Sequence, residues 1–388
     1  MSSITLMFED IKVLMIDLSN GQCGINDSLR MPFNLSLREG VDIDTCIYNL
    51  REFERWCANR TLSMSKANAK KICNAIGISQ GTSEKTRAGL ALAYRCLSLD
   101  DAWWTKRAGE DINWEQVSLH KNSARNVLTP ISLRGEVGSL FNGRLLNSSD
   151  LSVNGTFAKS WVRKESKLYL YKADEHETSD ETLREVLASN ILDCFNVKHV
   201  QYIIESDAGT RVTRCKCFTT EKVSFIPWRD YKSRCLRNGI DPFNTIREDF
   251  STEYANMIVA SYLIGNEDLH DGNWGFLLDN ETFKLIGLCP LFDFNYAMTP
   301  EYISTNAKGA MCIPETKVID RETGKELQDY EMYEYDYEII KSVTLEEAAI
   351  REMANASIQC IKPISEIKGL GLMEYLELQR RMEVLGLA

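Results

Sequence analysis

The sequence predicts an α+β protein with more than one domain. Two patterns of residue spacing indicate the class, and the length indicates the number of domains. Polar and apolar residues alternate as in strands between about 160 and 225, with one helix among them. From about 249 onward the apolar spacing is mostly helical, apart from a hairpin at 274–288. The chain has 388 residues, which is the length of about two to three average domains.

The composition is that of a globular protein with a large core. Hydrophobic residues make up 44% and charged residues 26%, with only 8 prolines and 22 glycines, which excludes a fibrous or disordered class. The formal net charge of −11 argues against nucleic acid or an anionic membrane as the direct partner. No apolar run reaches the length of about 18 residues that a membrane span needs. The 12 cysteines are scattered, so we expect reduced thiols in a cytoplasmic protein.

The first predicted domain comprises residues 1–125 and combines strands, helices and a connector. Short strands broken by glycines are expected up to about residue 45, and helical spacing of apolar residues follows as far as residue 97. A helix-turn-helix around Gly77 is the alternative for the helical part, but the acidic chain favours a packing subdomain. The segment 97–125 contains several tryptophans and is expected to be an irregular connector.

The second predicted domain, residues 126–222, carries a lysine on the apolar face of a strand. Because side chains alternate along a strand, Lys172 shares a face with Leu168 and Leu170. Burying its charge costs free energy unless an anion compensates it, and a nucleotide phosphate would do so. The helix that follows presents Glu185 at the border of its apolar stripe, where it can hold the lysine. The alternative is an edge strand with a solvent-exposed lysine.

The segment before this strand has the composition of a phosphate-binding loop. It combines small residues, a glycine and a lysine between two strands. The backbone N–H groups of such a loop can surround phosphate oxygens, although the pattern is neither a Walker A nor a G-x-G-x-x-G motif. The candidate nucleotide-binding residues here are Ser152, Val153, Asn154, Gly155 and Lys159.

The third predicted domain, residues 223–388, contains the densest group of polar residues in the chain. Asp268 and Asn273 stand five positions apart in a loop after an apolar helix, and Asp293 follows the hairpin. Phosphoryl transfer needs one carboxylate to orient the attacking hydroxyl and accept its proton, and oxygen ligands to hold Mg²⁺ against the phosphates. Asp268 is therefore the candidate base, with Asn273 and Asp293 as metal ligands. A solvated acidic turn is the alternative.

Taken together, these motifs resemble those of the HipA-like serine/threonine kinases of bacteria. The resemblance rests on the loop S-V-x-G-x-x-x-K at 152–159, the strand Y-L-Y-K ending at Lys172, the loop D-x-H-x-x-N at 268–273 and P-L-F-D ending at Asp293. It covers residues 130–300 in motif order. It implies a two-lobed protein-kinase-like fold, with an N-lobe at 126–222 and a mostly helical C-lobe at 223–388 after the small N-terminal domain.

The same resemblance implies roles for individual residues. Lys172 would bind ATP phosphates and Asp268 would be catalytic. Asn273 and Asp293 would bind Mg²⁺, so the implied cofactors are ATP and Mg²⁺. Ser152 matches the loop serine whose autophosphorylation silences members of the family. The remaining nucleotide-binding candidates are Glu185, His270 of the D-x-H-x-x-N loop, and Lys216 and Phe218, which fall where the family's hinge contacts adenine.

The resemblance also implies partners. Members of the family are often toxins restrained by a small DNA-binding antitoxin, so the expected partners are a protein substrate bearing Ser or Thr and such an antitoxin. Two departures from the family pattern stand out. Asn295 replaces the glycine of a D-F-G triplet, and the first 125 residues are patterned differently from the family's N-terminal domain.

Two alternative functions stay open at the level of the sequence. D-x-H-x-x-N also resembles the catalytic loop of phosphoinositide kinases, and the basic residues of 228–237 could meet a lipid headgroup or another small-molecule acceptor, unless they form a solvated helix face. The other alternative is a catalytically dead nucleotide-binding interaction module.

Overall fold

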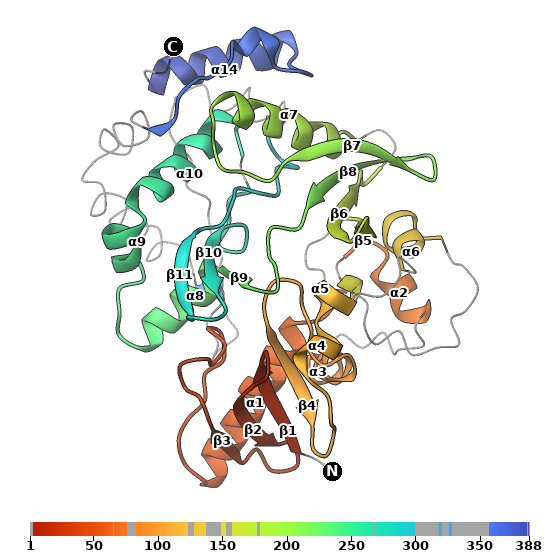
Figure 1. The fold of residues 1–388 in the computed structure, drawn as a ribbon, viewed down its shortest axis with the longest axis vertical. Helices are drawn as coiled ribbons and strands as arrows, with labels where there is room; N and C mark the ends of the chain where they lie inside the picture. Colours follow the sequence, from red (N-terminus) through yellow and green to blue (C-terminus); the bar gives the residue numbers. More distant parts are fainter. Residues whose placement is uncertain are drawn as a thin grey trace. The chain divides into compact units, whose positions relative to one another are not determined.

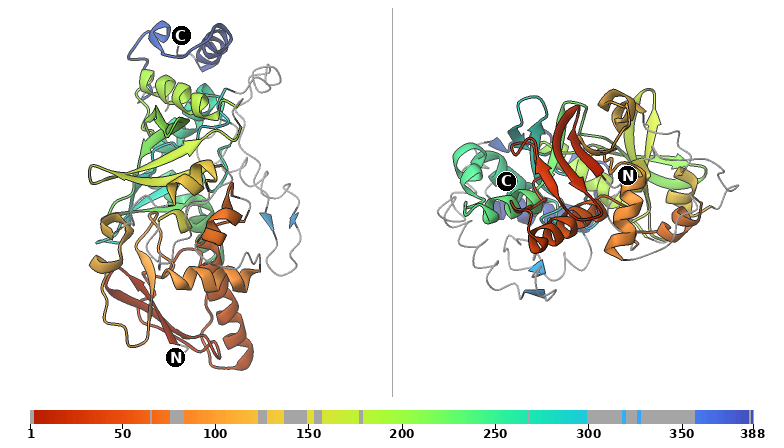
Figure 2. Two further views of the ribbon diagram at one scale, coloured as in Figure 1. Left: turned by 90° about the vertical axis from the view of Figure 1, so that its right-hand side faces the viewer. Right: turned by 90° about the horizontal axis from the view of Figure 1, so that it is seen from below.

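The computed structural model consists of two compact units that both contain helices and strands (Figure 1 and Figure 2). The first unit comprises residues 1–179, 205–226 and 278–285, and the second comprises 180–204, 227–277 and 286–388. The predicted α+β class is confirmed, whereas the predicted domain boundaries at 125 and 222 stay predictions. The structure describes residues 3–64, 66–75, 83–122, 128–136, 149–152, 157–176, 179–266, 268–298, 318–319, 326–327, 357–385 and 387.

The N-terminal part of the first unit contains a four-stranded sheet in the order β3–β2–β1–β4. The central strand β1 pairs antiparallel with both β2 and β4, with a register shift between Leu6 and Met7. The strands are β1 (Ser3–Phe8), β2 (Ile11–Asp17), β3 (Cys23–Ile25) and β4 (Trp103–Arg107). Strand β4 corrects the expectation of an irregular connector at 97–125. Its first three residues are all buried, so polar and apolar residues do not alternate along it.

Helix α1 (Ile43–Asn59) begins after Asp42, whose carboxylate accepts a hydrogen bond from the N–H of Thr45. Gly21, between β2 and β3, lies against this helix with φ +76°, and a Cβ there would be 2.0 Å from the Cys46 carbonyl oxygen. Only glycine therefore fits this position. The predicted helical spacing up to residue 97 is confirmed for the described residues, whereas Gly77 and the turn predicted around it lie outside them. The other helices of this unit are α2 (Ala69–Ala75), α3 (Glu84–Ala93), α4 (Trp114–Val117), α5 (Leu119–Asn122), α6 (Thr129–Arg134) and the 3₁₀ helix η1 (Ser149–Ser152).

A second sheet has the order β5–β6–β8–β7, with β6 antiparallel to both β5 and β8. Its strands are β5 (Lys159–Lys164), β6 (Lys167–Ala173), β7 (Tyr202–Asp207) and β8 (Thr210–Lys216). One face forms a hydrophobic core with Leu133 of α6, and its members are Ala158, Val162, Tyr171, Ala173 and Val212. Lys159 and Lys172 are direct cross-strand partners on the opposite face, and both are buried.

The predicted hairpin at 274–288 is confirmed as β10 and β11, which form a three-stranded sheet in the order β11–β10–β9. These strands are β9 (Val223–Pro227), β10 (Gly275–Asp279) and β11 (Lys284–Leu288). The described helices of the second unit are α7 (Glu181–Cys194), α8 (Trp228–Arg237), α9 (Asn244–Asp249), α10 (Ser251–Leu263) and α14 (Leu372–Leu385). This unit also contains β12 (Val318–Ile319), β13 (Glu326–Leu327) and the 3₁₀ helix η2 (Ile364–Glu366). None of the helices within the described ranges has the length and apolar character needed to cross a membrane.

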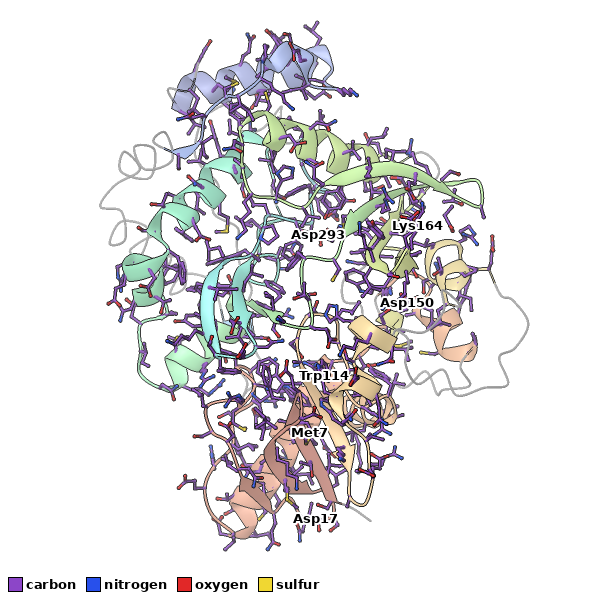
Figure 3. All side chains as sticks on the ribbon, in the orientation of Figure 1. Met7, Asp17, Trp114, Asp150, Lys164 and Asp293 are labelled. Carbon is purple, nitrogen blue, oxygen red and sulfur yellow. The ribbon has the colours of Figure 1, made fainter. Side chains whose placement is uncertain are left out.

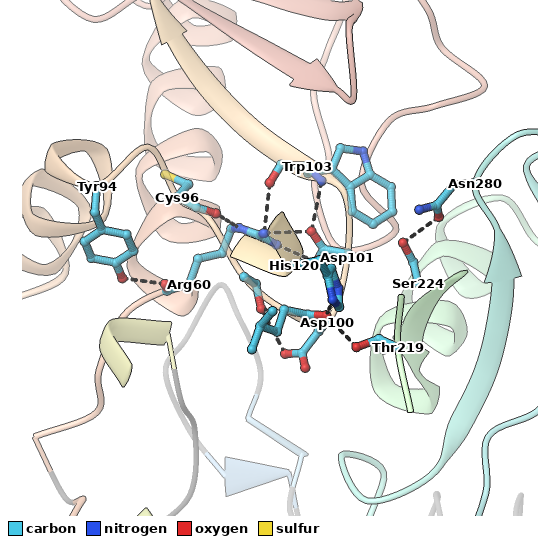
Figure 4. Close-up of polar contacts among 12 residues, drawn as sticks. Arg60, Tyr94, Cys96, Asp100, Asp101, Trp103, His120, Thr219, Ser224 and Asn280 are labelled. Carbon is cyan, nitrogen blue, oxygen red and sulfur yellow. Dashed lines mark hydrogen bonds and ion pairs between the residues drawn. The ribbon is translucent and has the colours of Figure 1, made fainter. Parts of the chain in front are cut away.

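A polar network holds the segment that leads into β4 against the end of α1 (Figure 4). Arg60, just after α1, donates to both carboxylate oxygens of Asp101 at 2.7 Å each. Its Nε–H donates to the Cys96 carbonyl oxygen at 2.6 Å, and its own carbonyl oxygen accepts from the Tyr94 hydroxyl at 2.6 Å. The side chains of Arg60 and Asp101 are each 10% exposed, so this ion pair is largely shielded from water.

Arg60→Met should lower the free energy of unfolding by about 3 to 5 kcal/mol, because it leaves the Asp101 carboxylate buried without its partner. Urea unfolding followed by tryptophan fluorescence measures the change. Arg51→Met is the matched control: Arg51 is an exposed residue of the same helix, and its loss should change the free energy by less than about 0.5 kcal/mol. Equal losses in both variants would show that the Arg60–Asp101 pair does not hold this part of the fold.

Candidate active site

The loop between α10 and β10 places Asp268 and Asn273 in direct contact. The side-chain amide of Asn273 donates to the Asp268 carbonyl oxygen at 2.8 Å and to the carboxylate Oδ2 at 3.2 Å. These bonds use the amide nitrogen, so Oδ1 of Asn273 is the atom left to meet a ligand. Asn273 is buried, whereas the Asp268 side chain is 31% exposed and therefore within reach of a substrate.

His270 lies beside the predicted base in the same loop. Its Nδ1 accepts the N–H of Gly272 at 3.0 Å, which in the neutral ring places the proton on Nε2, 3.9 Å from Oδ1 of Asp268. A Cβ at Gly272 would lie 2.9 Å from Cε1 of His270, so a larger residue there would displace the imidazole. The tight turn therefore holds the imidazole next to the carboxylate.

Aromatic stacking and backbone hydrogen bonds anchor this loop to α8. The rings of Trp274 and Trp228 stack with their centroids 4.5 Å apart, and the Trp228 N–H donates to the Trp274 carbonyl oxygen at 2.9 Å. The Arg229 N–H donates to the Asp271 carbonyl oxygen at 3.0 Å. Lys232 adds an ion pair of 3.5 Å with the Asp271 carboxylate. Lys232 is therefore buried against the loop and is not available to an external headgroup.

The β10–β11 hairpin brings Asn273 and Asp293 to the same end of the sheet, because Asn273 precedes β10 and Asp293 follows β11. The Cys289 N–H donates to the Gly275 carbonyl oxygen at 2.9 Å, so the segments before β10 and after β11 start from neighbouring positions. Asp293 has a left-handed backbone with φ +64°, and its N–H donates to the Tyr202 hydroxyl oxygen at 3.0 Å. A residue other than glycine in this conformation stores strain, which is typical of functional positions.

The donor atoms at this end of the hairpin are oxygens, the ligands that Mg²⁺ takes in proteins. Among the described residues, there is no group of three or more His, Cys, Asp or Glu side chains that could hold a metal ion. Asn295 is 3% exposed, and its Oδ1 has no hydrogen-bond partner in the described part of the chain. The Asn273 amide oxygen and the Asp293 carboxylate are therefore of the ligand type that Mg²⁺ takes, and their binding of the ion stays a prediction.

The nucleotide-binding candidates of the first unit lie near the start of β5. Lys159 and Lys172 are each 6% exposed and stand opposite each other on β5 and β6. Ser152 is buried at the end of η1, where its hydroxyl donates to the Ser149 carbonyl oxygen at 3.2 Å. The other predicted members of this loop, which lie outside the described residues, are Val153, Asn154 and Gly155.

The hinge candidates lie where the chain leaves β8. Lys216 is exposed at the end of the strand, and Phe218 packs edge to face against Phe225 with centroids 5.5 Å apart. Their contact with adenine stays a prediction. Glu185 is 1% exposed in α7. It belongs to the second unit and Lys172 to the first, so the pairing of the two stays a prediction as well.

The sequence interpretation missed Tyr202 and Lys66. Tyr202 binds the backbone of Asp293 from a strand 91 positions away. Lys66 is 3% exposed and feels the charge of Asp150, although a lysine in a polar stretch predicts exposure. Both contacts are long-range, so no local pattern of residues indicates them.

Asp293→Gly and Asp293→Ala both remove the carboxylate, but only glycine accepts φ +64° without strain. The glycine variant should therefore have the higher free energy of unfolding, by about 1 kcal/mol, as measured by urea denaturation. The same two substitutions at Glu248, an exposed position inside α9, serve as the control and should give the opposite order. Equal stabilities of the two Asp293 variants would mean that the left-handed backbone carries no strain.

The chain is similar to known proteins in part of its sequence and in its structure. No protein-family model matches the chain. Over 132 residues, or 30% of the chain, it is 25% identical to the serine/threonine-protein kinase CtkA of Helicobacter pylori, and the match spans 40% of that relative's length. The crystal structure of the proinflammatory kinase CtkA of H. pylori matches 60% of this chain and 91% of its own, with 16% identity and a TM-score of 0.40.

HipA of Shewanella oneidensis, solved in a toxin–antitoxin complex with HipB and operator DNA, matches 98% of this chain and 95% of its own. The TM-score is 0.51 and the identity 11%. The chain therefore has the fold of HipA, and its predicted resemblance to the HipA-like kinases is confirmed.

Proposed function

We propose that this chain is a MgATP-dependent kinase of the HipA-like type, which transfers the γ-phosphoryl group of ATP to a Ser or Thr hydroxyl of a protein. The observation that carries the proposal is the contact between Asn273 and Asp268, which holds a partly exposed carboxylate beside an amide. Such a loop supplies a base and a metal ligand together, as phosphoryl transfer needs. The 25% identity to a protein named as a serine/threonine kinase supports a protein acceptor.

In the proposed reaction, Asp268 accepts the proton of the acceptor hydroxyl while the hydroxyl oxygen forms a bond to the γ-phosphorus. The bond between this phosphorus and the β,γ-bridging oxygen breaks, and ADP leaves. The hydrogen bond from Asn273 to Oδ2 keeps the carboxylate oriented, and His270 lies 3.9 Å from Oδ1. Asp268 therefore acts mainly by aligning the hydroxyl, because the transition state of phosphoryl transfer is loose.

The remaining charged residues would stabilise the phosphates. Asn273 and Asp293 would hold Mg²⁺ through their side-chain oxygens, and the ion, when bound, neutralises charge on the β- and γ-phosphates. The strained backbone of Asp293, bonded to a tyrosine hydroxyl, supports a fixed position for its carboxylate. Lys159 and Lys172 would face the phosphates from the first unit, with Glu185 holding Lys172.

We further propose a partner of the antitoxin type and a toxin-like role in the cytoplasm. The HipA structure with the same fold contains HipB and operator DNA, which supports a partner of this kind. The net charge of this chain is −11. A partner with a positive surface, rather than this chain, would therefore contact any DNA.

Autophosphorylation of Ser152 is the finer part of the proposal. The Ser152 hydroxyl is buried and donates to the Ser149 carbonyl oxygen at 3.2 Å. Transfer to this hydroxyl requires that the end of η1 open first. We therefore expect slow labelling of Ser152 relative to an exposed acceptor.

Asp268→Asn should lower the rate of phosphoryl transfer by about 100-fold or more, the contribution of a positioned base, while MgATP binding is retained. Incubation with γ-labelled ATP and Mg²⁺, mapping of the labelled residues by mass spectrometry and calorimetry of ATP binding measure both properties. Asp249→Asn is the matched control, because Asp249 is exposed at the end of α9 and its loss removes the same charge. This control should keep the rate of the parent protein.

Label on Ser152 in the parent protein and its loss in Asp268→Asn would support a protein kinase that modifies itself. Transfer that survives in Asp268→Asn would rule out Asp268 as the base. ATP binding without transfer to any protein would favour the lipid-kinase or the dead-kinase alternative. A parent protein that binds no ATP would contradict the kinase proposal and both of its alternatives.

A further inference from the structure

The segment that contains Lys66 runs beside the candidate phosphate-binding part of the first unit. The Leu62 N–H donates to the Leu151 carbonyl oxygen at 2.8 Å, which ties this segment to η1. Ala67 packs against the hydrophobic core beneath β5 and β6. Lys66 lies between these two contacts in the sequence, so its backbone is held next to the start of β5.

Asp150, labelled in Figure 3, fastens η1 to the edge of β5. Its Oδ1 accepts the N–H of Trp161 at 2.8 Å. Its Oδ2 accepts from the hydroxyl of Ser160 at 2.8 Å and from that of Ser132 at 3.4 Å. The carboxylate is therefore used by hydrogen bonds within the fold, and none of these bonds comes from Lys66.

Lys66 is a buried cation that the fold does not satisfy. It is 3% exposed, and its Nζ has no hydrogen-bond partner among the described residues. Burial lowers the pKa of Lys66 to about 8, the nearby Asp150 opposes this shift, and Lys159 adds to it. A buried ammonium without hydrogen bonds costs free energy that an anionic ligand would recover.

The surrounding charges favour an anion with several negative groups. Lys159 and Lys172, direct partners on β5 and β6, are each 6% exposed. Lys66 lies close enough to Lys159 for the two charges to repel each other. Lys66 therefore lies near one carboxylate, that of Asp150, and near one further lysine, Lys159, whose cross-strand partner is Lys172.

We propose that Lys66 is a third phosphate-binding lysine of the nucleotide site, whose ammonium contacts the polyphosphate of a nucleoside triphosphate beside Lys159 and Lys172. The inference rests on the proposed function, because it assigns Lys66 to the same ATP site. It also gives the N-terminal part of the chain a direct role in substrate binding.

The protonation of Lys66 should respond to binding. In the free protein the ammonium loses its proton as the pH rises through about 8, and a bound phosphate keeps the proton in place. MgATP binding should therefore take up protons near this pH, and its affinity should fall as the pH rises from about 7 to about 9. The other charged groups that face Lys66 are Asp150 of η1 and Lys159 of β5, with Lys172 of β6 beyond them.

The test compares Lys66→Met with Lys70→Met, which removes the same charge at an exposed position of α2. Calorimetry measures the affinities for MgATP and for adenosine, and buffers of different ionisation enthalpy give the number of protons taken up. Lys66→Met should weaken MgATP binding by about tenfold or more, the effect of a lost charge-assisted hydrogen bond. It should leave adenosine binding unchanged and abolish the proton uptake, whereas Lys70→Met should behave as the parent protein does.

The same measurements on Lys66→Arg and on the parent protein separate a loss of phosphate binding from a loss of folding. Arginine keeps the charge, so this variant should retain MgATP affinity but lose the proton uptake, because its guanidinium does not titrate in this range. Parent-like MgATP binding in Lys66→Met, or an equal loss for MgATP and adenosine, would overturn the role of Lys66 and leave the proposed function standing. A parent protein that binds neither ligand would overturn the proposed function, and the inference with it.

Discussion

The candidate site of the second unit depends on the closure of the β10–β11 hairpin. The hydrogen bond from Cys289 to Gly275 brings the two ends of the hairpin together, and Asn273 and Asp293 both extend from that end. Without this closure the two candidate oxygen ligands would belong to independent loops, and each would lose more freedom of motion if it bound a metal ion. The stack of Trp274 on Trp228 fixes the same end of the hairpin to α8, so the loop that carries Asp268 has a rigid base.

The charged groups of the two units differ in their exposure to water. The Asp268 carboxylate of the second unit is partly exposed and is oriented by a neutral amide, which leaves it able to accept a proton. The lysines of the first unit are almost fully buried, where their charge is costly in the absence of an anion. The burial of Lys66 without a hydrogen bond is therefore the stronger sign of an anionic ligand, while the geometry of the loop is the stronger sign of chemistry.

The fold and the function rest on different kinds of observation. The chain shares the HipA fold at 11% sequence identity, so few individual side chains are needed to specify that architecture. A fold at this identity can serve many activities, and only the residues of a site argue for one of them. Here Asp268, Asn273 and Asp293 argue for the proposed phosphoryl transfer, because their side-chain oxygens suit that chemistry and Asp293 has a left-handed backbone, which is typical of functional positions.

Features with a short-range cause could be predicted from the sequence. The α+β class, the helices up to residue 97 and the 274–288 hairpin follow from local periodicity. The contact of Asp268 with Asn273 follows from their positions in one short loop. Strand β4 could not be predicted, because its first three residues are all buried and show no alternation, and its pairing partner β1 is distant in the sequence.

The same reason explains the site residues that the sequence did not indicate. Lys66 reads as an exposed lysine in a polar stretch, and Lys232 as part of a basic helix face, yet both are buried. Tyr202 fixes Asp293 from a distant strand. The sequence by itself determined which residue types are available for the chemistry and where the local elements begin and end. Only the tertiary structure decided which charges are buried and which groups meet, because burial and long-range contact arise when distant segments pack together.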